Sequence, residues 1–392
     1  LRMPIMRSGE KPQANDLYMA NVKTSFIRKQ REKEEAQQDI SLYSDLLNND
    51  SITGVSLIDR TGLIQMPYNF KLYEPFRMPT DLTGHTLTYE ECCQKRAAEL
   101  LELSDRLNKP IYVCYSGGID STLVVISFLK QRGLAQLKKQ LVIVLTPDSI
   151  DENPVFYRDY IRDHFTVVSG ERLGTYFDGQ RIIVGGEHND QLFGTDIIDK
   201  LVKHINIDKV FEPYHRDALV PYLIHYEMPE ASANWWYDMF VWHAKQAPCE
   251  IKTTFDLLWW FNFCFKWQTV YFRMLLRVDN SLRHLVDHEF VETYFHHFYS
   301  TVDFQKWSML NPQLKIRNNN WKDYKFHAKD VIYNFNQDAD YRDNKIKRRS
   351  LFKLFIGKDT PDGLSGNFDY LYKLDRADFY VEDNSFKNNY AT

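Results

Sequence analysis

The chain has 392 residues, enough for a sizeable core and roughly two or three domains. Its 49 Lys and Arg residues nearly balance 53 Asp and Glu residues, and a formal net charge of -4 argues against a nucleic-acid partner. The five cysteines are odd in number and lack CxxC spacing, which argues against a disulfide framework or a thiolate metal site and favours a reducing, cytoplasmic setting.

The N-terminal part gives weaker signals. Residues Asn21 to Asp39 form a highly charged run that predicts an exposed helix or arm, and Ile52 to Leu63 has the composition of a small hairpin. Apolar residues at helical spacing then predict a helix from Leu87 to Leu107.

Short apolar strands alternate with helical segments over the next part of the chain. Strands are predicted at Ile111 to Tyr115, Leu141 to Leu145 and Arg181 to Val184, with helices at Thr122 to Leu129 and Pro154 to His164. Because the strands are apolar throughout, we expect an α/β fold with a parallel sheet that has helices on both faces.

The second half is predicted to be mainly helical. Beyond about Asp196 no strand pattern is convincing, and aromatic-rich segments keep helical spacing to about Phe298. The most apolar stretch, Leu257 to Val270, is too short and too polar for a membrane span, so no membrane partner is expected. The tail from Gly357 is rich in Gly, Asp, Asn and Tyr and is interpreted as partly irregular.

A glycine-containing turn between the first strand and its helix is the main candidate for a binding loop. It consists of Ser116, Gly117, Gly118, Ile119, Asp120 and Ser121. Glycines allow phosphate oxygens to approach the backbone and permit left-handed angles, and the amides that begin the helix then face the anion. The two serines add hydroxyl donors, and the aspartate can hold a cation that bridges phosphates. A plain turn without a ligand is the alternative interpretation.

The motif S-G-G-x-D-S after a strand resembles the signature of the ATP-pyrophosphatases. A second segment, G-E-H-N-D-Q-L-F-G from Gly186 to Gly194, resembles the G-E-G-S-D-E-L-F-G segment of asparagine synthetases and β-lactam synthetases. The resemblance implies an adenine nucleotide α-hydrolase-like (PP-loop) fold and an asparagine synthetase-like domain over residues 96–392. Residues 1–95 are then a region of uncertain fold.

The resemblance also implies roles for individual residues. Asp120 and Asp190 match the family's Mg²⁺ ligands, and Glu187 matches a glutamate near the substrate. The resemblance places ATP at the first motif, with the adenine near Cys114 and Leu145 and with Gly186 close to the nucleotide, residues that we regard as cofactor-binding candidates.

Two lysines are candidates for the family's catalytic lysine. A weaker match, His284 to Val291, resembles the family's P-F-L-D-x-x-F-[LV] segment, and the basic run from Tyr341 to Arg348 follows where the family has this lysine. Lys345 and Lys347 both fit, with Lys347 slightly preferred because of its R-x-K-like spacing. A nucleic-acid patch or a plain solvated face are the alternatives for this basic cluster.

The chain departs from the family in two ways. Its short N-terminal region has no candidate nucleophile for a glutaminase, so the nitrogen donor is expected to be free ammonia, an amine, or ammonia from a separate partner. In the second motif, His188, Asn189 and Gln191 replace Gly, Ser and Glu, which puts aspartate in doubt as the substrate.

The sequence therefore predicts an ATP- and Mg²⁺-dependent ligase that adenylates a small-molecule carboxylate and forms an amide. An ATP-pyrophosphatase that modifies a nucleobase or tRNA is an alternative, although such relatives commonly carry cysteine clusters. A non-catalytic synthetase fold that serves as a binding protein is another. The pair His296-His297 is interpreted as part of a solvated or packed helix face and not as a metal site. The doublets Trp235-Trp236 and Trp259-Trp260 are interpreted as core residues and not as base-stacking positions.

Overall fold

The computed structural model describes residues 16–18, 59–63, 69–71, 76–194, 206–225, 230–272, 274–279, 281–282, 285–286, 288–320 and 323–345. The chain divides into two compact units. Unit 1 comprises Leu1–Tyr89, Glu187–Leu276 and Ser300–His327, and unit 2 comprises Glu90–Gly186, Arg277–Tyr299 and Ala328–Thr392. The predicted N-terminal arm, the predicted tail, Lys347 and all of the predicted hairpin except residues 59–63 lie outside the described residues.

A parallel sheet forms the centre of unit 2. Within the described residues its five strands follow the order β5-β4-β3-β6-β7, and every neighbouring pair is parallel. Their bounds are β3 Ile111–Cys114, β4 Leu141–Leu145, β5 Thr166–Ser169, β6 Ile182–Gly185 and β7 Phe295–His297. This sheet confirms the predicted α/β class and the strands that we expected at the positions of β3, β4 and β6.

Strands β5 and β7 were not predicted. The expectation that no strand follows Asp196 is wrong for β7, which pairs with β6 so that Gly185 lies opposite His297. Three residues of sequence Phe-His-His carry no recognisable strand pattern, and only the position beside β6 makes them a strand. His296 and His297 are buried on this strand and do not lie on a helix face, and burial lowers the pKa of His296 to about 3.

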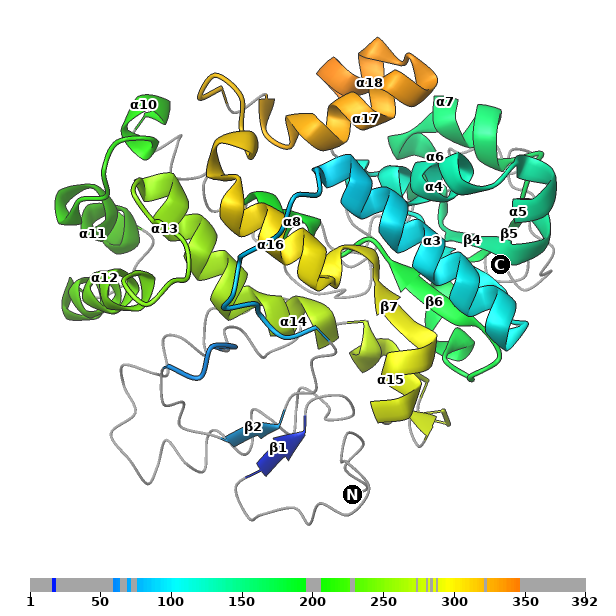
Figure 1. Cartoon of the computed structure of the whole chain (residues 1–392), viewed down its shortest axis with the longest axis horizontal. Helices are drawn as coiled ribbons and strands as arrows, with labels where there is room; N and C mark the ends of the chain where they lie inside the picture. The colour runs from blue at the N-terminus through cyan, green and yellow to red at the C-terminus, as the bar shows by residue number, and fades with distance from the viewer. Residues whose placement is uncertain are drawn as a thin grey trace, which may run out of the picture. The chain divides into compact units, whose positions relative to one another are not determined.

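In unit 2, helices precede, separate and follow the strands of the sheet (Figure 1). They are α3 Tyr89–Leu107, α4 Ile119–Gln131, α5 Leu134–Gln140, α6 Pro147–Glu152, α7 Pro154–Phe156, α15 His288–Tyr294, α17 Phe326–Asn336 and α18 Ala339–Asn344, with a π-helical turn at Tyr157–Ile161 and 3₁₀ turns at Gly170–Tyr176, Leu275–Arg277 and Phe298–Ser300. The predicted helices at Leu87 to Leu107 and Thr122 to Leu129 are confirmed as α3 and α4. In α4 the run from Ser121 to Phe128 is wholly buried, as its apolar sequence requires.

The strand order creates a switch point between β3 and β6. The chain leaves β3 for β4 and β5 on one side, then returns past β3 to β6 on the other. Because crossovers between parallel strands are right-handed, the two sets of connections run over opposite faces. Ligands of open α/β sheets bind at such a point, outside the carboxyl ends of the strands. The first motif follows β3 and Gly186 follows β6, so both lie at this position.

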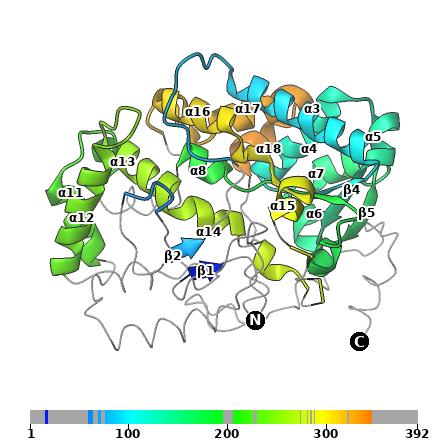
Figure 2. The same cartoon turned by 60° about the horizontal axis from the view of Figure 1, so that its bottom comes forward.

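Unit 1 is mainly helical over its described residues. It contains α8 Asn189–Phe193, α10 Ile207–Val210, α11 Arg216–His225, α12 Glu230–Ala244, α13 Thr254–Phe261, a π-helical turn Asn262–Lys266, α14 Trp267–Phe272, α16 Val302–Leu310 and a 3₁₀ turn Pro312–Leu314, and the short strands β1 Asp16–Tyr18 and β2 Asn69–Lys71 pair in parallel. Helices α11 and α12 lie side by side in Figures 1 and 2. Among the described residues we find no helix with the length and apolar character that a membrane crossing needs.

Aromatic side chains build the core of unit 1. Trp259, Trp260, Phe263 and Trp267 are buried along α13, the π-helical turn and α14. Trp259 and Trp260 therefore pack in the core, as we expected from the sequence. Trp260 also donates through Nε1 to His243 Nδ1 at 2.9 Å, which satisfies the indole inside the core.

Candidate active site

The first motif forms a loop whose hydroxyl groups are ordered by the loop itself. The Ser121 hydroxyl accepts a hydrogen bond from the Ser116 amide at 3.0 Å and donates to the Gly118 carbonyl at 3.2 Å. The Ser116 hydroxyl lies 3.0 Å from the Ser121 hydroxyl and accepts from the Gly118 amide at 3.2 Å. These bonds fix both serines at the start of α4, where the helix dipole favours an anion.

The two glycines of the loop have different functions. Gly117 adopts φ +75°, and a Cβ there would lie 2.2 Å from the Ser149 carbonyl oxygen and 2.9 Å from Glu152 Cβ. Gly118 has an extended backbone with φ -73°, and a Cβ there would meet the Ser116 hydroxyl at 3.1 Å. Only Gly117 therefore needs the left-handed region, and it needs a hydrogen in place of a side chain because the segment after β4 packs directly against it.

Other predicted nucleotide residues lie around the same switch point. A Cβ on Gly186 would be 3.3 Å from both the Cα and the amide nitrogen of Ser121, so the end of β6 lies against the first turn of α4. Asp120 is in that first turn and is half-buried. Cys114 ends β3 and is half-buried, whereas Leu145 ends β4 and is fully buried. The structure thus brings the unit 2 candidates together at the carboxyl ends of neighbouring strands.

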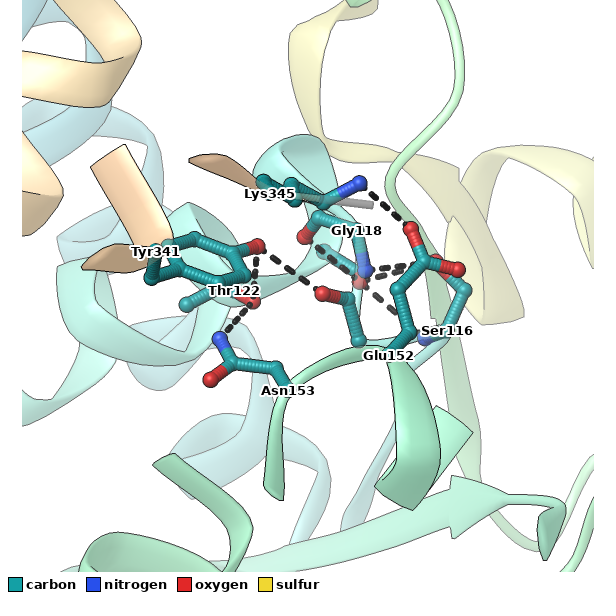
Figure 3. A network of polar contacts seen from close by, with 9 residues as sticks. Ser116, Gly118, Thr122, Glu152, Asn153, Tyr341 and Lys345 are labelled. Atoms are coloured by element: carbon teal, nitrogen blue, oxygen red, sulfur yellow. Dashed lines mark hydrogen bonds and ion pairs between the residues drawn. The ribbon is translucent and has the colours of Figure 1, made fainter. Parts of the chain in front are cut away.

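Helix α18 is tied to the loop through Tyr341 (Figure 3). The Tyr341 hydroxyl donates to the Gly117 carbonyl at 2.8 Å and lies 3.3 Å from the Thr122 hydroxyl. Asn153 donates to the same Thr122 hydroxyl at 3.4 Å. Burial raises the pKa of Tyr341, so the phenol stays neutral and remains a donor. This anchor holds the end of α18, and hence the residue after it, beside the loop.

Lys345 follows α18 and forms an ion pair with Glu152, the last residue of α6. The Lys345 Nζ donates to Glu152 Oε1 at 2.6 Å, and the two side chains are only 12% and 8% exposed. The same Oε1 would lie 3.4 Å from a Cβ on Gly118, so the pair lies next to the loop (Figure 3). Glu152 belongs to neither motif, and nothing in the sequence singled it out. Lys347, which the sequence favoured slightly, lies outside the described residues.

The second motif continues into unit 1, where Asp190 is paired with a lysine. Asp190 Oδ1 lies 2.6 Å from Lys325 Nζ and 3.5 Å from the Tyr324 hydroxyl. The carboxylate is 58% exposed although the lysine is only 6% exposed. Glu187 is half-buried. Because Asp120 belongs to unit 2 and Asp190 to unit 1, their joint Mg²⁺ site stays a prediction.

The residues that depart from the family motif are part of the unit 1 core. His188 is buried at φ +76°, with Nε2 3.0 Å from the Trp267 carbonyl and its ring 4.2 Å from the Trp267 ring. Asn189 is fully buried and accepts from the Tyr89 hydroxyl at 2.8 Å. Gln191 is also buried, next to Asn262. The three replacements are therefore explained by contacts with protein neighbours.

A buried lysine lies behind the second motif. Lys315 is fully buried, and its Nζ lies 3.2 Å from the centre of the Trp259 ring, whose indole nitrogen donates to the carbonyls of Gln191 and Leu192 at 3.1 Å. Within the described residues the ammonium has no hydrogen-bond partner. Burial lowers the pKa of Lys315 to about 7, against a smaller opposing effect of Asp256. The contact with the aromatic face favours the charged form as well.

Comparisons with known proteins add no assignment. No family model matches the chain, and no curated protein matches it significantly. The resemblance therefore depends on the motif residues themselves and on their place at the switch point.

Proposed function

We propose that the chain is an ATP-dependent ligase that activates a carboxylate as its adenylate, releases pyrophosphate and forms an amide with ammonia or an amine. One observation carries the proposal. The Ser-Gly-Gly-Ile-Asp-Ser loop lies at the switch point of a parallel sheet, with Gly117 in the left-handed region and a lysine beside it. This combination is better explained by a phosphate-binding loop than by a plain turn without a ligand.

The residues of the loop supply complementary groups for a phosphate chain. The first-turn amides of α4 and the Ser116 hydroxyl can donate to phosphate oxygens, and the Ser121 hydroxyl can do so if it gives up its bond to the Gly118 carbonyl. The Lys345 ammonium can neutralise charge that builds up as pyrophosphate leaves, and a fixed cation of this kind lowers the barrier. Asp120, in the first turn, provides a carboxylate that could hold Mg²⁺, and the ion would supply electrostatic stabilisation of the phosphate charge.

The proposed reaction has two steps. A carboxylate oxygen of the substrate attacks the α-phosphorus of ATP, a bond forms between them, and the bond from the α-phosphorus to the α–β bridging oxygen breaks, so that pyrophosphate leaves with the electron pair. Ammonia or an amine then attacks the acyl carbon, AMP leaves with its oxygen, and the nitrogen loses a proton to give the amide. We name the substrate only as a carboxylate, because His188, Asn189 and Gln191, where the second motif differs from the family, are buried among protein neighbours and do not identify a substrate.

The test is a product analysis. The purified chain is incubated with ATP, Mg²⁺, ammonium and a panel of small carboxylates, and nucleotides are separated by chromatography. We expect substrate-dependent release of AMP and pyrophosphate in equal amounts. Formation of ADP and phosphate as main products would overturn the proposal, and AMP release that requires a nucleobase or tRNA would favour the other enzyme class. Release of glutamate from glutamine is not expected.

A further inference from the structure

The ion pair between Lys345 and Glu152 places a carboxylate next to the candidate phosphate loop. Both side chains are largely removed from solvent, and Glu152 Oε1 lies within van der Waals range of the position that a Cβ on Gly118 would take. An anion bound in this loop would therefore lie near a carboxylate. Like charges at such a distance repel strongly in a partly buried setting, unless a cation compensates for them.

Lys345 provides that compensation. Its Nζ lies 2.6 Å from Glu152 Oε1, which makes the pair neutral at the loop. The helix that precedes it is held by Tyr341, which donates to the Gly117 carbonyl, so the backbone next to the lysine is also bonded to this loop. A flexible lysine side chain loses rotational freedom when it is held in one place, and the bond to Glu152 offsets that cost before any ligand binds.

We propose that Glu152 is a positioning residue, which holds the Lys345 ammonium at the Gly117–Gly118 loop and releases it to the pyrophosphate part of bound ATP. The inference rests on the proposed function. Protein kinases likewise hold a phosphate-contacting lysine through an ion pair with a glutamate, and the arrangement here has the same logic on a different fold. Glu152 itself does not touch the phosphates.

The inference predicts how substitutions of the pair change the affinity for inorganic pyrophosphate with Mg²⁺, which calorimetry on the full chain measures. Glu152→Gln keeps the shape and removes the repelling charge, so pyrophosphate should bind about tenfold more tightly. Lys345→Met removes the ammonium that pairs with Glu152 Oε1 and so leaves the loop more negative, which should weaken binding about tenfold. The double variant restores neutrality and should bind within about threefold of the wild type.

Turnover should change in a different order. Glu152→Gln should lower kcat for AMP release about tenfold although it binds pyrophosphate more tightly, because Lys345 is no longer held where charge develops. Glu152→Asp should recover part of kcat, since the carboxylate is kept with a chain one methylene shorter. If Glu152 only stabilised the fold, Glu152→Gln would not combine tighter pyrophosphate binding with a lower kcat.

The matched control is another ion pair of unit 2. Lys130 Nζ lies 2.6 Å from Glu90 Oε1, the same separation, at the far end of α4. Lys130→Met and Glu90→Gln should leave pyrophosphate binding and kcat unchanged. Thermal unfolding of each variant shows whether it is folded, and the double variant has the same net charge as the wild type.

The outcomes decide the inference separately from the function. Weaker pyrophosphate binding by Glu152→Gln would mean that the carboxylate holds the metal ion, and unchanged binding would mean that the pair does not face the ligand; either result overturns the inference. AMP release by the wild type together with either result leaves the proposed function intact. The predicted binding order together with ADP formation would instead retain Glu152 as a positioning residue and overturn the proposed function.

Discussion

The two motif segments differ in what their polar side chains bond to. In the unit 2 loop, the polar groups of Ser116, Gly118 and Ser121 bond to one another. In the unit 1 segment, His188 and Asn189 are buried and bonded to core residues. The first segment is thus ordered by bonds within itself, whereas the second is ordered by its contacts with neighbours in the core.

The largest effect is expected for Gly117→Ala. The added Cβ would lie 2.2 Å from the Ser149 carbonyl oxygen, and the backbone would be held at φ +75°. The left-handed cost and the clash together should lower the free energy of unfolding by about 3–5 kcal/mol and abolish AMP release. Chemical denaturation and product analysis measure the two effects.

Two other glycines serve as controls for this change. Gly133 has φ -65° and no atom within 4 Å of its would-be Cβ, so Gly133→Ala should be nearly neutral. Gly118→Ala should fold, because its φ of -73° suits any residue, but should weaken pyrophosphate binding. Equal losses of stability in Gly117→Ala and Gly133→Ala would contradict the assigned geometry of the loop.

The next largest effects are expected for substitutions of Asp120 and Asp190, and they should differ between the two segments. Asp120→Asn should lower AMP release by a factor of about 10² with little loss of stability. Asp190→Asn should lower it similarly but also destabilise unit 1, because the largely buried Lys325 loses its carboxylate partner. Activity assays with Mg²⁺ titration and thermal unfolding measure both. Wild-type activity of either variant at saturating Mg²⁺ would remove that aspartate from the proposed metal site.

The sequence predicted what depends on local pattern. The strands at β3, β4 and β6 were visible because each is an uninterrupted apolar run, and the loop after β3 was visible from its glycines and hydroxyls. Strand β7 was not visible, because Phe-His-His becomes a strand only through pairing with β6. Its bounds are set by a tertiary contact that no local preference encodes.

The same limit applies to the candidate site. Glu152 lies 193 residues before Lys345, and only the folding of α18 against the loop brings the two side chains together. From the resemblance, the replacements at His188, Asn189 and Gln191 were interpreted as evidence on the substrate, although all three side chains are buried and His188 packs against Trp267. The motifs thus gave the candidate residues, whereas their partners, such as Glu152 and Trp267, were visible only in the structure because they come from long-range packing.

A smaller effect, on stability alone, is expected for Lys315→Met. Methionine keeps the volume and the contact with the Trp259 ring but needs no hydration, so the variant should be more stable than the wild type by about 2 kcal/mol at pH 7. The pKa of Lys315 is lowered from 10.5 to about 7, so between these values the unfolded chain holds a proton that the folded chain lacks. Wild-type stability should therefore rise with pH across this window, by at most about 1.4 kcal/mol per unit.

Chemical denaturation at about pH 7 and about pH 9.5 measures this dependence. The advantage of Lys315→Met should shrink as the pH approaches 10.5, above which the lysine is neutral in both states. Loss of stability in the variant at neutral pH would mean that the contact between the ammonium and the Trp259 ring outweighs the cost of burial.

The smallest effect concerns the backbone of the second motif at His188. This residue adopts φ +76°, at a position where the similar segment of asparagine synthetases has glycine. The left-handed conformation therefore costs histidine about 1 kcal/mol that glycine would not incur. Its ring compensates by packing 4.2 Å from the Trp267 ring and bonding to the Trp267 carbonyl. His188→Gly loses the packing but relieves the strain, whereas His188→Ala loses the packing and keeps the strain. Both should be less stable than the wild type, with the alanine variant lower than the glycine variant by about 1 kcal/mol in chemical denaturation. Equal stability of the two variants would show that the left-handed backbone at this position carries no strain.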